Sequence, residues 1–229
     1  NNDGDLTSNI VTTSNVDTST LGMYTVTHSV LDASGNNGSA SRQVGVVGGQ
    51  PTPCNVVWLD YNGVTVRACD GAIVGEQGVL NGVTYTIVNK TMLADIIYNE
   101  EDNLASVCTS LITDMRELFY FETGRNPMNQ DISSWDVSNV TTMYQMFAQS
   151  AFNQDISTWD VSSVNDMENM FSSSSFNQPI SSWDVSNVTN MGYMFYAATS
   201  FNQDLSSWSV DNVTSCVSFS DSAPLTEEN

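Results

Sequence analysis

Apolar residues in the second half of the chain recur with a period of 24 or 25 residues. Tryptophans mark the period, and the residue eight positions after each is a methionine in three units and a cysteine in the last: Trp135, Trp159, Trp183 and Trp208, followed by Met143, Met167, Met191 and Cys216. An earlier stretch, residues 107–119, fits the pattern with a valine in the tryptophan position. A fixed period of this length predicts an array of stacked units.

Each unit contains two apolar patterns. Ile156, Trp159 and Val161 have the spacing of the short strand in a leucine-rich repeat, where alternate side chains point inward. The sequence M-x-x-M-F at 167–171 has the i, i+3, i+4 spacing of one or two helical turns with a polar cap. Because so short a unit cannot bury its own apolar face, we expect an α+β fold whose units form a leucine-rich-repeat-like solenoid of about five rungs over 107–220.

Two further regions precede the repeats. Residues 1–47 alternate apolar and polar positions around a turn-like D-A-S-G-N-N-G-S, which predicts part of an all-β domain, with its histidine, His28, as an ordinary strand residue. A Gly/Pro-rich linker follows at 48–54. Residues 221–229 lose the repeat and form an acidic exit tail.

Residues 55–106 are interpreted as a small β-rich cap. Asn62-Gly63 between two apolar runs predicts a hairpin, and residues 80–89 read as another strand. Met92, Leu93, Ile96 and Ile97 have helical spacing. A solenoid needs its first apolar face covered, and this segment is placed to cover it.

The repeats resemble those of the BspA-like leucine-rich repeat surface proteins of bacteria, in which F-N-Q-D-I-S-S-W-D-V-S-N-V-T-N-M-x-x-M-F recurs. Residues 62–115 resemble the lead-in of the flavobacterial members, and 1–47 resemble the C-terminal half of a bacterial immunoglobulin-like domain. The resemblance implies a secreted or cell-surface protein associated with adhesion and protein binding, and so an extracellular or cell-surface location.

Composition narrows the partners. The chain has 26 acidic against 5 basic residues, a net charge of −21, so its surface repels nucleic acid and anionic lipid. No run of residues approaches the roughly 18 apolar residues of a membrane span, and we expect no membrane insertion in this segment. One histidine and no G-x-S-x-G, H-E-x-x-H or phosphate-binding loop predict that the chain is not an enzyme.

The four cysteines allow three complete pairings. Stacking at about 4.8 Å per strand puts Cys108 and Cys216 roughly 20 Å apart, too far for a disulfide, and Cys216 in a core methionine position is expected to be a buried free thiol. The family lead-in implies a Cys69–Cys108 disulfide, with Cys54–Cys69 as the alternative. Either bond implies an oxidising setting.

Carboxylates are the candidate binding groups. Asp136, Asp160 and Asp184 each lie between the inward-facing tryptophan and valine, so they should face outward one rung apart. The row is either a solvated acidic face or a binding stripe for a basic partner or divalent cations. Asp3 and Asp5 offer oxygen ligands for calcium but miss the EF-hand pattern. No cofactor is required, and calcium is the one metal considered.

Repetition builds a rigid, chemically uniform face, which suits interaction better than chemistry. The leading hypothesis is a non-enzymatic segment of an adhesin-like bacterial surface protein that binds a protein or glycan. The alternative is a structural spacer, stalk or filament subunit, in which copies associate through chain ends.

Overall fold

The computed structural model describes residues 10–14, 22–31, 37–46, 54–99, 103–121 and 127–224. The chain divides into two compact units, Asn1–Thr52 and Pro53–Asn229.

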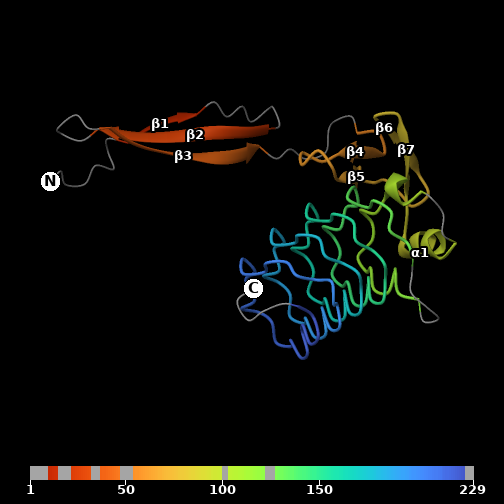
Figure 1. Ribbon diagram of the computed structural model, residues 1–229. Helices are drawn as coiled ribbons and strands as arrows, with labels where there is room; N and C mark the ends of the chain where they lie inside the picture. Colours follow the sequence, from red (N-terminus) through yellow and green to blue (C-terminus); the bar gives the residue numbers. More distant parts are fainter. Residues whose placement is uncertain are drawn as a thin grey trace. The chain divides into compact units, whose positions relative to one another are not determined.

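The first unit contains a three-stranded antiparallel sheet in the order β1-β2-β3 (Figure 1). Its strands are β1 Ile10–Ser14, β2 Gly22–Leu31 and β3 Asn37–Val46. The predicted strand and its return strand are therefore confirmed. His28 lies within β2, opposite Ala40 of β3.

The second unit begins with the hairpin expected around Asn62-Gly63. Strand β4 (Val57–Leu59) pairs antiparallel with β5 (Val66–Ala68). The loop that connects the two strands is longer than a two-residue turn. Its conformation is held by the Asn62 Oδ1 atom, which accepts from the backbone N–H groups of Val64 and Thr65, both at 2.9 Å. Gly63 supplies the left-handed backbone, with φ of 74°.

A second hairpin was missed in the sequence. Residues 80–89 were expected to form one strand, but β6 (Gln77–Leu80) and β7 (Val83–Ile87) are antiparallel neighbours. Asn81 and Gly82 between them have φ of 51° and 82°, as a two-residue type I′ turn requires. Strand β7 also pairs in parallel with β8 (Val107–Cys108), which leads into the repeats.

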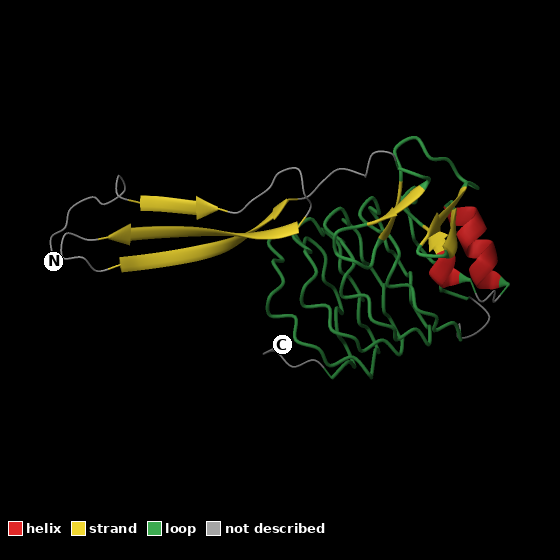
Figure 2. Ribbon diagram, turned by 90° about the horizontal axis from the view of Figure 1, so that it is seen from above, coloured by secondary structure: helices red, strands yellow, loops and turns green. Residues whose placement is uncertain are grey.

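The predicted helix is confirmed as α1, Lys90–Tyr98. Its N-cap is Asn89, whose Oδ1 atom accepts from the Met92 N–H at 2.9 Å. Leu93 and Ile97 are buried on the face that packs on the first repeat, together with the short 3-10 helix η2 (Leu104–Ser106). Figure 2 shows α1 at one end of the stacked coils.

The repeats wind as successive coils that lie side by side (Figures 1 and 2). We number them coil 1 (107–121), coil 2 (127–150), coil 3 (151–175), coil 4 (176–200) and coil 5 (201–224). Parallel bridges join one position of each coil to the next: Asp114↔Thr142, Thr142↔Asp166, Asp166↔Asn190 and Asn190↔Ser215.

The local structure expected inside each unit is wrong. The segment around Trp159 forms turns, in which the Trp159 N–H donates to the Ile156 carbonyl at 3.1 Å. The M-x-x-M-F segment is not helical, since Asn169 within it has a φ of 58°. Its alternate N–H groups instead donate to carbonyls of the next coil, as Met167 does to Asn190 at 2.9 Å. Backbone hydrogen bonds between neighbouring coils thus replace the hydrogen bonds that a helix would make within a single coil.

Aromatic side chains stack along the core. The rings of Trp135 and Trp159 lie 6.3 Å apart and those of Trp183 and Trp208 6.5 Å apart, nearly parallel in both pairs. Each indole N–H also donates to a backbone carbonyl of the preceding coil, as Trp183 does to Ile156 at 3.1 Å, and Trp135 donates to Leu104 of η2. Burial of the tryptophan therefore leaves no polar atom unpaired.

A ladder of asparagines fixes the turn between coils. The Oδ1 atoms of Asn129, Asn153 and Asn177 accept from the backbone N–H of Asn153, Asn177 and Asn202, at 2.7, 2.8 and 2.9 Å. Each amide satisfies a backbone donor that the bend exposes. Coils are thus held in register on two sides, by this ladder and by the parallel bridges.

Candidate interaction surface

A polar cavity of about 280 Å³ lies where the β4–β5 hairpin meets coils 2 to 4. Its charged lining is three carboxylates and one guanidinium, with hydroxyl and aromatic groups at its edge: Asp60, Asp136, Asp160 and Arg67, with Tyr61, Ser157, Thr158 and Ser182. Tyr61 is strongly exposed. We call this region the junction cavity.

Arg67 of β5 holds the buried side of the junction cavity together. Its Nε atom donates to the buried carboxylate of Asp60, its Nη1 atom donates to the Ser138 hydroxyl at 3.1 Å, and Nη1 lies 3.7 Å from Asp136. Partial burial by itself would lower the pKa of Arg67, but Asp136, with Asp60 and Asp160, raises it above its usual value. The guanidinium therefore stays charged and links the cap to coil 2.

The expected row of three outward-facing carboxylates is corrected at its first member. Asp136 is only 3% exposed, because the β4–β5 hairpin covers it. Its Oδ2 atom accepts from the Ser110 hydroxyl at 2.6 Å, and its Oδ1 atom accepts from the Ser138 hydroxyl at 2.7 Å. Asp136 is thus a paired structural charge, and not an open binding group.

Asp160 and Asp184 do face solvent, as expected. The Asp160 Oδ1 atom accepts from the Ser162 hydroxyl at 2.6 Å, and the Asp184 Oδ1 atom accepts from the Ser186 N–H at 3.0 Å. Hydrogen bonds from the Ser186 hydroxyl and N–H lower the pKa of Asp184. Ser186 therefore favours the ionised form of Asp184.

No basic side chain occurs after Arg125, whereas residues 126–229 contain twelve acidic ones. Coils 2 to 5 thus carry acidic side chains and no basic one. Such a surface attracts cationic groups and repels anionic ones over distances of about a Debye length.

The structure describes no chelating cluster for a metal ion. Within residues 10–14, 22–31, 37–46, 54–99, 103–121 and 127–224 no group of three or more His, Cys, Asp or Glu side chains is arranged to hold one. Asp3 and Asp5 lie outside the described residues.

The predicted disulfide is wrong. Cys69 is bonded to Cys54, the alternative pairing, with 5.9 Å between their Cα atoms. The reason is strand register, since the Cys69 N–H donates to the Val56 carbonyl at 2.8 Å and continues the hairpin beside Cys54. Cys108 is a buried free thiol whose sulfur lies 3.5 Å from the Val66 carbonyl. Burial raises the pKa of Cys108, which disfavours the reactive thiolate.

Cys216 is free, as expected, but it is exposed and not buried. Earlier coils bury the equivalent methionines under the following coil, and no described residue covers coil 5 in that way. The expectation assumed that every unit has a neighbour on both sides, and the described residues give coil 5 only the neighbour before it.

Sequence reasoning missed Arg67, Asp60 and Tyr61. All three residues lie near Asn62-Gly63, so the sequence predicted the hairpin that contains them. It did not predict that this hairpin packs against coil 2. One usable signal was the rarity of basic residues, since an arginine in a chain with so few of them is a strong candidate partner for buried carboxylates.

Among the residues that the structure describes, there is no helix with the length and apolar character needed to cross a membrane.

Comparison with known families gave two matches. Residues 1–46 are similar to the family described as bacterial surface protein, Ig-like domain. Residues 90–174 and, in a second overlapping match, 113–228 match the family described as Mycoplasma protein of unknown function, DUF285. Neither curated proteins nor solved structures gave a match. Together the two family matches indicate a bacterial surface protein, located at the cell surface or outside the cell. The match to the DUF285 family covers more than half of the chain. The chain therefore belongs to this family.

Proposed function

We propose that this chain is a non-enzymatic segment of an adhesin-like bacterial surface protein, in which a BspA-like, leucine-rich-repeat-type solenoid presents a rigid face to a protein or glycan. The period of 24 or 25 residues and the parallel bridges between coils support the solenoid. The family matches support the bacterial surface.

One observation carries the interaction role. The junction cavity opens beside a face on which Asp160 and Asp184 are exposed and no basic residue neutralises them within the coils. Exposed Tyr61 adds an aromatic ring at the edge of the cavity, where it can stack on a sugar or pack on a side chain. Carboxylates, hydroxyls and an aromatic ring together suit a partner that brings cationic or hydroxyl groups.

A non-enzymatic role fits the available side chains. The single histidine of the chain lies in β2, in the first unit. Of the free thiols, Cys108 is buried. Nothing in the junction cavity pairs a nucleophile with a base, since its carboxylates are engaged by serines and Arg67.

The test is binding of the whole chain to arrays of glycans and of basic, neutral and acidic peptides. We expect binding to members of the basic or glycan sets and none to the acidic set. The Asp160→Asn/Asp184→Asn double variant should bind at least about tenfold more weakly, because it removes two exposed charges from the face.

The matched control is Asp95→Asn/Asp221→Asn, which removes the same charge from α1 and from the last turn. Equal losses in the two double variants would show only a general charge effect and would count against a specific face. Failure to bind anything on either array at low salt would remove the interaction role.

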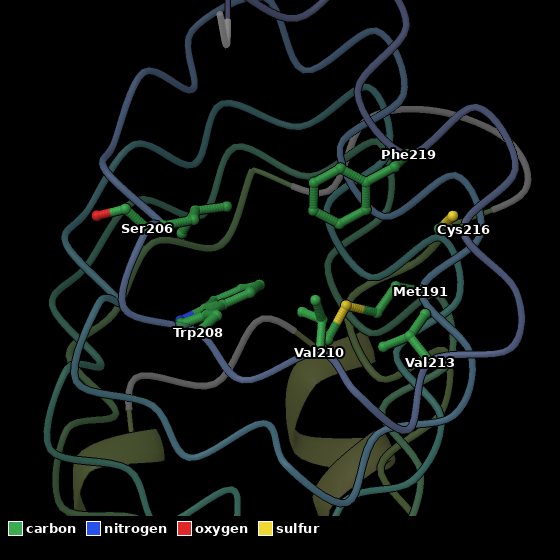
Figure 3. Close-up of a pocket in the computed structure, with 8 residues that line it drawn as sticks. Met191, Ser206, Trp208, Val210, Val213, Cys216 and Phe219 are labelled. Atoms are coloured by element: carbon green, nitrogen blue, oxygen red, sulfur yellow. The ribbon is translucent and has the colours of Figure 1, made fainter. Parts of the chain in front are cut away.

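The alternative role as a structural spacer is favoured by one observation, the apolar end of coil 5 (Figure 3), which none of the described residues covers. Contacts between copies at that end serve such a role without any recognition face.

A further inference from the structure

The junction cavity is lined by a hydrogen-bond donor and an acceptor that the described residues leave unused. The Nε and Nη1 atoms of Arg67 are engaged by Asp60 and Ser138, whereas Nη2 has no partner within the described chain. The Asp160 carboxylate accepts from Ser162 through Oδ1, and no described residue donates to its Oδ2 atom. Both side chains line the cavity. A ligand that pairs with both must therefore donate and accept hydrogen bonds.

The charges around the cavity disfavour an ionic ligand of either sign. A carboxylate or phosphate would meet Asp160 and the acidic coils, which repel anions. A lysine ammonium would be attracted by the carboxylates, but it only donates hydrogen bonds. It would leave the Nη2 atom of Arg67 unpaired and would place a second cation beside it. A hydroxyl group carries no charge and both donates and accepts, so it matches the two side chains together.

An aromatic ring lies at the edge of the cavity. Tyr61 is 65% exposed. The backbone around it is fixed, because the Tyr61 N–H donates to the Asp60 carboxylate at 2.6 Å and the Gly63 N–H donates to the Asp60 carbonyl at 2.9 Å. A ring held in this way can stack on an apolar ligand face at little cost in entropy. A pyranose sugar has such a face, formed by its C–H groups, with hydroxyls around its edge.

The volume of the cavity, about 280 Å³, limits the size of the ligand. Sites for drug-sized molecules have about 300–1,000 Å³, so this cavity suits a single ring and not a buried oligosaccharide. Asp184, the equivalent of Asp160 one coil further from the cap, is not part of its lining. Within the described residues the β4–β5 hairpin thus forms one such cavity with the coils, and one site per chain is expected.

We propose that the junction cavity binds one neutral pyranose residue of a glycan, with the C–H face of the sugar on Tyr61 and its hydroxyls between Arg67 and Asp160. This assignment rests on the proposed function and specifies it, because it selects a glycan over a protein as the partner. The hydroxyls of Ser157 and Thr158 line the same cavity and add further polar contacts. Glycans that end in an anionic sugar are repelled by the acidic coils.

The test is titration of the whole chain with small probes, followed by saturation-transfer difference NMR. The neutral probes are the methyl glycosides of glucose, galactose, mannose and N-acetylglucosamine. Glucuronic acid is the anionic ring of matched size, and Nα-acetyl-lysine amide represents a basic side chain. We expect at least one neutral glycoside to bind at one site per chain, and both charged probes to bind at least about tenfold more weakly than it does.

Two variants place the sugar in the cavity. Tyr61→Ala removes the stacking ring, and Asp160→Asn removes the charged acceptor with little change in shape. Each should weaken glycoside binding about fivefold or more. Both side chains are exposed, so neither change disturbs the core. The controls are Tyr98→Ala on α1 and Asp204→Asn on coil 5, an exposed tyrosine and an exposed aspartate outside the cavity, which should leave binding unchanged.

Three outcomes would overturn the assignment. Equal losses in the test and control variants would place the sugar elsewhere on the chain. Binding of the lysine probe without binding of any neutral glycoside would exclude a sugar, and would leave the proposed function standing with a basic partner. Binding of no probe would also exclude a sugar in this cavity, while the glycan and peptide arrays decide separately whether the chain has an interaction role.

Discussion

Arg67 is the residue on which the junction between cap and coils depends. It is shared by two carboxylates that are almost fully buried, Asp60 and Asp136. A buried charge is tolerated only while it is paired, so loss of Arg67 leaves two carboxylates without a counter-charge.

Arg67→Met should therefore lower the free energy of unfolding by about 3–5 kcal/mol, although it keeps an unbranched apolar stem in place of the arginine methylenes. Urea denaturation of the whole chain measures this. The control is Arg116→Met, since Arg116 is more than half exposed and pairs with Asp114 at the surface, where a loss of at most about 1 kcal/mol is expected. Equal losses in the two variants would show that Arg67 is not a buried link.

Trp159 tests the packing of the coils at a single position. It is buried, stacks on Trp135 and donates its indole N–H to the Ile132 carbonyl at 3.3 Å. Trp159→Ala should cost about 3–5 kcal/mol of unfolding free energy because it opens a cavity between two coils. Trp159→Phe keeps a ring and should cost less. A loss under about 1 kcal/mol for Trp159→Ala would mean that the ring is not in the core.

At the scale of elements, the sequence predicted periodic features better than local geometry. The tryptophan period and the spacing of α1 both depend on which positions face inward, and both were confirmed. The i, i+3, i+4 spacing of M-x-x-M-F was misleading, because the same apolar positions also face inward in turns whose donors pair with the next coil. That choice depends on neighbouring coils, which a local pattern does not contain.

Contacts between elements far apart in the sequence were also not predicted. Burial of Asp136 depends on a hairpin about seventy residues earlier in the chain, and the Cys54–Cys69 bond depends on the register within that hairpin. Asn81-Gly82 shows the opposite case. Its signal was local and sufficient, but the stretch around it was interpreted as one continuous strand.

The N-cap of α1 gives a test at the scale of an element. Asn89→Ala removes the side-chain acceptor for the Met92 N–H and should destabilise the chain by about 1 kcal/mol. Asn89→Asp keeps the acceptor and should retain most of the stability. Chemical denaturation compares the three proteins. Equal stability of the alanine variant and the wild type would mean that the packing of Leu93 and Ile97 alone holds the helix.

At the scale of the whole molecule, the excess of acidic charge opposes compactness. Residues 126–229 contain twelve acidic side chains and no basic one, and the exposed carboxylates among them repel one another. Neighbouring like charges contribute about 1 kcal/mol or less each when well solvated, but the contributions accumulate.

The melting temperature of the chain should therefore rise between 0.01 M and 0.1 M sodium chloride, as the Debye length falls from about 30 Å to about 10 Å. The Asp160→Asn/Asp184→Asn double variant should melt higher at low salt and gain less from added salt, because fewer charges remain to be screened. Differential scanning calorimetry at fixed pH measures both. The same response to salt in both proteins would show that repulsion along this face does not limit stability.

The ladder of bonds between coils also determines how the molecule responds to a pulling force. Each coil is attached to its neighbour by similar hydrogen bonds and ring contacts, and among the described residues coil 5 has a neighbouring coil on one side only. A tether loaded from that side loses one coil at a time, and each coil frees 24 or 25 residues, or about 85 Å of extended chain at roughly 3.5 Å per residue. We therefore expect the stack to lengthen in equal steps under tension, and in the surface role proposed above such stepwise extension would absorb mechanical shock.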